Sequence, residues 1–212
     1  MNLGPAGPDP RSLTERWAAL WPECAPVPTR LRAAYPDRWV RFRTLPEGRR
    51  CPDSENEYAA VLARHDTVLG DLADRPLLVF TAGYSETLPP GDRDQEITDL
   101  QPHGVYWTSV LLTDQRTGYE VHQHLYASRT GWSPGCLDPL LRHVAGDLAA
   151  TVLVADAELR WLYHPFAGGM DVILPTRELR DGLAARHARW TSPGAPGSDP
   201  TSRPGSGRPS TA

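Results

Sequence analysis

The sequence contains no lysine, so all 22 of its basic side chains are arginines. This absence excludes mechanisms that need a lysine amine, such as Schiff-base catalysis and the lysine of phosphate-binding loops. Cysteine is also scarce, with Cys24, Cys51 and Cys136 lying far apart. An odd number at this spacing argues against a disulfide framework and against a zinc motif of closely paired ligands. We therefore expect reduced thiols and no cofactor.

A long hydrophobic run is missing, and the N-terminus lacks the positive start and apolar core of a secretory signal. We expect a cytoplasmic protein without a membrane partner. The net charge of −4 gives no overall basic footprint for nucleic acid. Phosphate-loop, dinucleotide-binding and nucleophile-elbow motifs are absent as well, so no reaction chemistry can be read directly from a motif.

Composition divides the chain into three parts. Residues 1–11 are rich in glycine and proline, which predicts a flexible N-terminus. Residues 192–212 consist almost entirely of glycine, proline, serine, threonine and arginine, and such a segment buries too little apolar surface to offset its ordering entropy. We therefore predict a single folded domain over residues 12–191, followed by a disordered tail.

Two pairs of strand-like segments predict β-hairpins. Residues 105–112 and 119–126 are joined by a loop of moderate length that contains a glycine, and residues 161–164 and 170–174 are joined by a turn with two glycines. Two hairpins argue against a repeating strand-helix-strand pattern. They favour an α+β fold, in which about four helices cover one face of a largely antiparallel sheet.

Start signals and apolar spacing predict the four helices. Ser54, three residues before a glutamate, precedes the longest helical stripe, and Ser12 begins a similar capping pattern. Asp138 before a proline and Thr176 before an acidic first turn are further candidate N-caps.

Between these elements, single strands are expected at residues 39–45, 77–81 and 151–155. Three prolines predict an extended connector over residues 22–28. Residues 83–100 show no periodicity and are predicted to form a long loop, which is either functional or disordered.

The strand at 39–45 carries a candidate binding surface. Arg41 and Arg43 alternate with core residues, and Arg49 and Arg50 follow in the next loop. These arginines could bind an acidic partner, a phosphate or a carboxylate. We favour the alternative that they keep an edge strand soluble, because nearby acids leave no excess of positive charge.

His122 and His124 are candidate metal ligands, because residues two apart in a strand project from the same face. His103 or His164 could complete such a site. The favoured alternative is the polar, solvated face of an antiparallel strand, since local spacing supplies no third ligand.

His164 and Asp171 flank the glycine turn of the second hairpin and are candidate catalytic residues. Their positions could bring them together as an acid-base or orienting pair. A nucleophile is harder to find. Cys136 before a predicted helix is one candidate, although a cysteine that packs as a small hydrophobe is the favoured interpretation.

Two separated blocks resemble a known family. The segments WVRFRT and NEYAAVLARHDTVLGDL, and later LYHPFAGGMDVI with a downstream tryptophan, are similar to the bacterial family called domain of unknown function 3885. The residues that carry the resemblance are Arg41, Phe42, Glu57, Tyr58, Arg64, Tyr163, Gly169, Asp171 and Trp190. The chain has Phe-Ala-Gly-Gly where the family has Tyr-Asp-Asp-Arg-Gly. The resemblance implies a shared fold and no particular activity.

The leading functional interpretation is a small binding or interaction module without catalysis, a regulatory or immunity-type partner of another bacterial protein. Its surface would comprise the long loop and the C-terminal hairpin, with Arg41, Arg43 and Tyr163 as candidate binding residues. The alternative is a hydrolase-like enzyme that uses His164 and Asp171. His122 and His124 could contribute to the same site, with or without a metal. Convergence of these side chains in one concave pocket would favour the enzyme.

Overall fold

The computed structural model describes residues 7–73, 76–148 and 151–191. The strands are β1 (Trp39–Arg43), β2 (Leu77–Ser85), β3 (Val105–Thr113), β4 (Glu120–Thr130), β5 (Val152–Asp156), β6 (Leu162–Phe166) and β7 (Gly169–Ile173). The α-helices are α1 (Pro10–Leu20), α2 (Pro28–Ala34), α3 (Glu55–Leu72), α4 (Gln95–Leu100), α5 (Asp138–Ala145) and α6 (Arg177–Arg186). Among these residues, seven strands form one sheet in the order β1-β7-β6-β5-β2-β4-β3, and every neighbouring pair is antiparallel. The predicted α+β class is confirmed.

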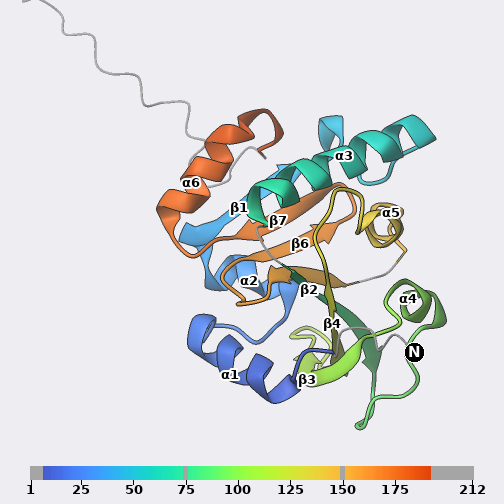
Figure 1. Ribbon diagram of the computed structural model, residues 1–212. Coiled ribbons are helices and arrows are strands. Elements are labelled where there is room, and N and C mark those ends of the chain that lie inside the picture. Colours follow the sequence, from blue (N-terminus) through green and yellow to red (C-terminus); the bar gives the residue numbers. More distant parts are fainter. Residues whose placement is uncertain (1–6, 74–75, 149–150, 192–212) are drawn as a thin grey trace, which may run out of the picture.

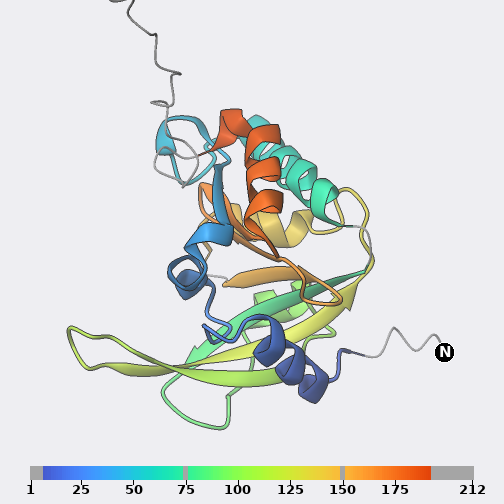
Figure 2. The same ribbon diagram turned by 90° about the vertical axis from the view of Figure 1, so that its left-hand side faces the viewer.

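Helices cover both faces of the sheet, whereas the sequence led us to expect one covered face. Helices α3, α5 and α6 lie on one side, and α1 and α2 lie on the other (Figures 1 and 2). The reason lies in the central strands, which are apolar at consecutive positions. In β2, Leu77 and Val79 enter one core cluster, and Leu78 and Phe80 enter the other. A strand buried on both faces needs a helical layer on each.

Local signals placed several elements correctly. The β3–β4 and β6–β7 hairpins are present, and β3 and β4 form the long arm that projects from the body in Figure 2. Strands β5 and β6 form a further pair of consecutive antiparallel strands. Helix α3 is capped by Ser54, whose side chain accepts from the backbone N–H of Glu57, and α6 is capped in the same way by Thr176.

Two predicted helix starts are wrong. Helix α1 begins at Pro10, because the carboxylate of Asp9 accepts from the backbone N–H groups of Arg11 and Ser12. The residues just before Ser12, which we expected to be flexible, therefore belong to the helix and its cap. In α5, Asp138 is the first helical residue rather than the cap. The predicted flexibility of residues 1–6 and disorder of residues 192–212 concern parts of the chain outside the described residues.

Two short helices were missed. Helix α2 begins at Pro28, where a proline costs nothing because the first N–H of a helix has no partner within the helix. Helix α4 lies inside the expected long loop and is capped by Asp94, and β2 extends into the same segment as far as Ser85. Among the described residues, no helix is both long and apolar enough to span a bilayer.

Candidate functional site

Consecutive residues of β6 project from opposite faces of the sheet. Each belongs to a row of paired residues that runs across β6, β7 and β1. Tyr163 is paired with Val172 of β7, on the face covered by α3. His164 is paired with Asp171, which is paired in turn with Arg41 of β1. Because side chains alternate along a strand, this second row projects from the opposite face, which faces α2. Three candidate residues from distant parts of the sequence thus lie side by side.

Arg41 and Asp171 form the best-defined contact of the second row. The guanidinium donates from Nε to Oδ1 and from Nη2 to Oδ2, both at 2.7 Å. Its Cζ lies 4.6 Å from the ring centre of Phe166 and 5.5 Å from that of Trp39. Asp171 is only 5% exposed, and its hydrogen bonds raise the pKa of Arg41. This bidentate pair is a neutral and geometrically constrained unit.

His164 is held by the backbone rather than by Asp171. Its Nδ1 lies 2.8 Å from the carbonyl oxygen of Val152, so Nδ1–H is the donor and the neutral ring carries its lone pair on Nε2. Burial lowers the pKa of His164. The hydrogen bond to Val152 and the charge of Asp171 oppose this shift in part, and the Arg41 charge adds a smaller lowering effect. The ring is therefore neutral at physiological pH.

An open cleft of about 680 Å³ lies over this row. Its walls come from α2, β1, the loop after β1, the end of α5 and the β6–β7 hairpin. Among the described residues, the charged side chains that line it are Arg32, Arg41, Arg43, Arg49, Arg50, Asp147 and Asp171. The lining therefore holds five arginines and only two aspartates, in a protein whose net charge is −4. Our expectation of no local positive excess is wrong at this site.

Two of these arginines are committed to neighbouring acids. Arg49 donates to Asp53 at 2.8 Å and also to Glu57, and the hydrogen bond from Arg49 to Glu57 lowers the pKa of Glu57. Arg50 donates to both carboxylate oxygens of Asp147 at 3.1 Å. These pairs shape the wall of the cleft but leave little charge for a ligand.

Arg32 and Arg43 are different. Within the described parts of the chain, neither guanidinium forms an ion pair with an acidic side chain. Arg32 lies with its Cζ 5.5 Å from the ring centre of Trp39, and Arg43 projects towards Gly48 in the turn after β1. The unneutralised positive charge of the cleft is therefore located on these two side chains.

Gly168 positions the loop that carries Arg49 and Arg50. Its φ is +89°, and a Cβ on this residue would lie 2.7 Å from the carbonyl oxygen of Arg49. The carbonyl oxygen of Gly168 also accepts a 3.1 Å hydrogen bond from the backbone N–H of Thr44. The glycine turn thus allows the hairpin and the arginine loop to touch, which a side chain would prevent.

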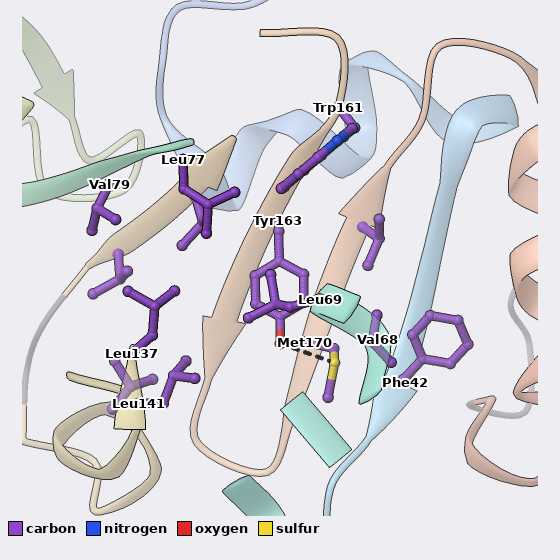
Figure 3. Packing of buried hydrophobic residues seen from close by; sticks show 14 of the residues in the cluster. Phe42, Val68, Leu69, Leu77, Val79, Leu137, Leu141, Trp161, Tyr163 and Met170 are labelled. Atoms are coloured by element: carbon purple, nitrogen blue, oxygen red, sulfur yellow. Dashed lines mark hydrogen bonds between the residues drawn. The ribbon is translucent and has the colours of Figure 1, made fainter. Parts of the chain in front are cut away.

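Tyr163, a candidate binding residue, lies in the core instead of the cleft. It is fully buried, and its hydroxyl group is hydrogen-bonded to the ring of His65 in α3. The same hydroxyl group lies 3.2 Å from the sulfur of Met170 (Figure 3). Burial raises the pKa of Tyr163 well above its usual range and lowers that of His65 to about 3. Tyr163 therefore packs on the face of the sheet opposite to the row of His164, Asp171 and Arg41.

His122 and His124 do share a face of β4, but this is the face opposite to His164, and β5 and β2 lie between the two strands. His124 is hydrogen-bonded through Nε2 to Ser85 at 2.7 Å and through Nδ1 to Ser109 at 2.6 Å. In the described portion of the chain, no group of three histidine, cysteine, aspartate or glutamate side chains is placed to hold a metal ion. His122 and His124 therefore do not converge with His164 and Asp171.

Sequence reasoning missed Arg32 because it missed the helix that carries it. The only local signal was Pro28 followed by residues that favour helix, in a segment where other prolines suggested a connector. Phe166 was likewise treated as part of a turn, although its ring packs on the Arg41 guanidinium.

The fold and the site define an α+β protein with an arginine-lined cleft at one edge of a seven-stranded antiparallel sheet. The chain belongs to the family described as Domain of unknown function (DUF3885), whose family model matches residues 27–194. The two blocks that carried the resemblance meet in the structure through the pairing of β1 with β7 and through Arg64, whose Cζ lies 5.5 Å from the ring centre of Trp190. No curated protein and no solved structure matches the chain.

Proposed function

We propose that this protein is a binding module without catalysis, a regulatory or immunity-type partner of another protein in the bacterial cytoplasm, and that the cleft is its contact surface. One observation carries the proposal. Two guanidinium groups without acidic partners, those of Arg32 and Arg43, lie beside the constrained pair of Arg41 and Asp171.

This arrangement suits recognition of an anionic group. The Arg41 charge is already neutralised by Asp171, so the pair contributes rigidity rather than attraction. Arg32 and Arg43 retain their charge and their donors. Guanidinium groups bind carboxylates through directional hydrogen bonds, and a concave surface reduces the exposure of those bonds to water.

The alternative role of the arginines, to keep an edge strand soluble, explains only part of the geometry. β1 is indeed at the edge of the sheet. However, Arg41 packs between two aromatic rings and binds a buried carboxylate, which is not how a solubilising side chain is placed. Arg43 is not constrained in this way. Affinity capture with an Arg32→Gln/Arg43→Gln variant distinguishes a binding role from a solubilising one.

A hydrolase-like function is the second candidate, because His164 and Asp171 line the same cleft. Their hydrogen bonds support it less well. Both carboxylate oxygens of Asp171 accept from Arg41, and His164 donates to Val152, so the two do not form a His-Asp pair. The hydroxyl groups in the lining, those of Thr29 and Thr151, are not hydrogen-bonded to His164.

Affinity capture tests the proposal. Wild-type protein, an Arg32→Gln/Arg43→Gln variant and an Arg116→Gln control would serve as baits in extract from cells that naturally contain the protein. Arg116 is an exposed arginine in the β3–β4 turn, so the control removes a charge far from the cleft. We expect one protein to be enriched by the wild type and the control and lost with the double variant. Equal recovery by all three baits, or recovery of no partner, would count against the proposal.

A further inference from the structure

We infer that the cleft accepts an extended acidic peptide segment whose two carboxylates, four residues apart, bind Arg32 and Arg43. This inference rests on the proposed function and names the chemistry of the partner segment.

The two arginines without acidic partners lie towards opposite ends of β1, which indicates a ligand longer than a single anion. Arg32 lies over Trp39, the first residue of β1, whereas Arg43 is the last residue of that strand. A strand rises about 3.3 Å per residue, so the backbone positions of Trp39 and Arg43 are about 13 Å apart. Arg41 lies between them and is already bound to Asp171. One phosphate or one carboxylate is too small to reach both ends.

An extended peptide matches this spacing. Its side chains also alternate, so residues four apart point to the same side and are separated by about 13 Å. The volume of about 680 Å³ lies within the range typical of ligand sites, about 300–1,000 Å³. The cleft is open, so a segment of a larger protein can lie across it.

Charge favours a protein segment over nucleic acid. The whole chain carries a net charge of −4, which repels an extended phosphate backbone. The C-terminal residues of the chain itself are a poor match, because Arg203 and Arg208 outnumber Asp199 beyond the end of the described part.

Fluorescence anisotropy with the full-length protein tests the inference. The probe is a labelled glycine-serine peptide with two glutamates separated by three residues, and the comparison peptide carries the two glutamates side by side. We expect the spaced peptide to bind more tightly. We expect Arg43→Gln, which is half-buried, to weaken binding about tenfold, and exposed Arg32→Gln about threefold. The Arg116→Gln control should bind like the wild type.

Several outcomes would overturn the inference. They are equal affinity for the two peptides, complete competition by inorganic phosphate, tighter binding of a short DNA duplex, or unchanged affinity in both arginine variants. If these occur while the captured native partner still depends on Arg32 and Arg43, the acidic-segment inference fails and the proposed function stands. If the native partner binds the double variant normally, the cleft is not the contact surface and both fail.

Discussion

Tyr163 and His164 are neighbours in one strand, yet they belong to regions with opposite properties. Tyr163 is sealed beneath α3 and is hydrogen-bonded to His65, which burial keeps neutral. His164 lies beside the charged pair of Arg41 and Asp171 at an open cleft. What covers each face of the sheet decides the difference. A sealed interior accepts polar groups only when they are paired and neutral, whereas a partly solvated site can hold guanidinium groups.

The two regions differ in whether their polar residues support folding or are available for recognition. On the sealed side, Tyr163 and His65 are hydrogen-bonded to each other inside the protein, so a substitution of either should change folding. On the open side, Arg41 and Asp171 behave like the sealed pair, while Arg32 and Arg43 have no such partner. We therefore expect stability to depend on the paired residues and binding to depend on the unpaired ones.

The largest effect is expected from Asp171→Ala. This change leaves the Arg41 guanidinium without its carboxylate, and we expect a loss of about 3 kcal/mol in the free energy of unfolding. Urea denaturation measures it. Glu158→Ala, which breaks an exposed ion pair with Arg16, is the matched control and should cost less than about 1 kcal/mol. Similar losses in both variants would contradict the importance of the buried pair.

The second largest effect is expected from acid, which should lower the free energy of unfolding through His65 on the sealed side. The pKa of His65 is 6.5 in the unfolded chain and about 3 in the folded protein, so between these values the unfolded state binds the additional proton. Stability should therefore fall as the pH drops below about 6.5, by about 2 kcal/mol at pH 5, and this contribution should level off near pH 3. Urea titrations of the wild type and of His65→Leu/Tyr163→Phe across this range provide the test. An equally steep profile in the double variant would show that His65 is not responsible.

A smaller loss is expected from Tyr163→Phe alone. Removal of the hydroxyl leaves Nδ1 of His65 buried without its partner, which should cost about 1–2 kcal/mol. Replacing both groups in His65→Leu/Tyr163→Phe should restore part of that loss at neutral pH, because no polar atom of the pair is then left unsatisfied. Thermal unfolding of the two variants gives the comparison, and a double variant much less stable than the single one would refute it.

The smallest effect on folding is expected from the two cleft arginines that have no acidic partner. Arg32→Gln and Arg43→Gln remove side chains without acidic partners, so each should change the free energy of unfolding by less than about 0.5 kcal/mol. Calorimetry would measure this, with Arg116→Gln as the control. A loss as large as that of Asp171→Ala would make these arginines structural and remove the distinction between paired and unpaired residues.

The sequence predicted the elements whose signals are local. Ser54 and Thr176 cap their helices as expected, and the glycine turn forms the predicted hairpin. We did not predict that helices cover both faces of the sheet. Over a few residues, a continuous apolar run such as that in β2 is hard to distinguish from an alternating pattern. Helices α2 and α4 were missed because proline-rich or aperiodic segments hide short helices.

The site was only partly predictable for a related reason. Arg41, Arg43, His164 and Asp171 were all recognised as candidates, and all four line the cleft. Their arrangement depends on the pairing of β1 with β7, which brings together residues 130 positions apart and leaves no local trace in the sequence. Asp171 was a candidate because it flanks the glycine turn, and the structure supplies its partner, Arg41.

The most direct test of the account is side-chain NMR of the arginine Nε–H groups during titration with the spaced acidic peptide. We predict that the Arg32 and Arg43 signals shift progressively, while the Arg116 signal stays in place and Arg41 remains hydrogen-bonded to Asp171. Shifts confined to arginines outside the cleft, or the absence of any shift at Arg32 and Arg43, would contradict the assignment of the cleft as the binding surface.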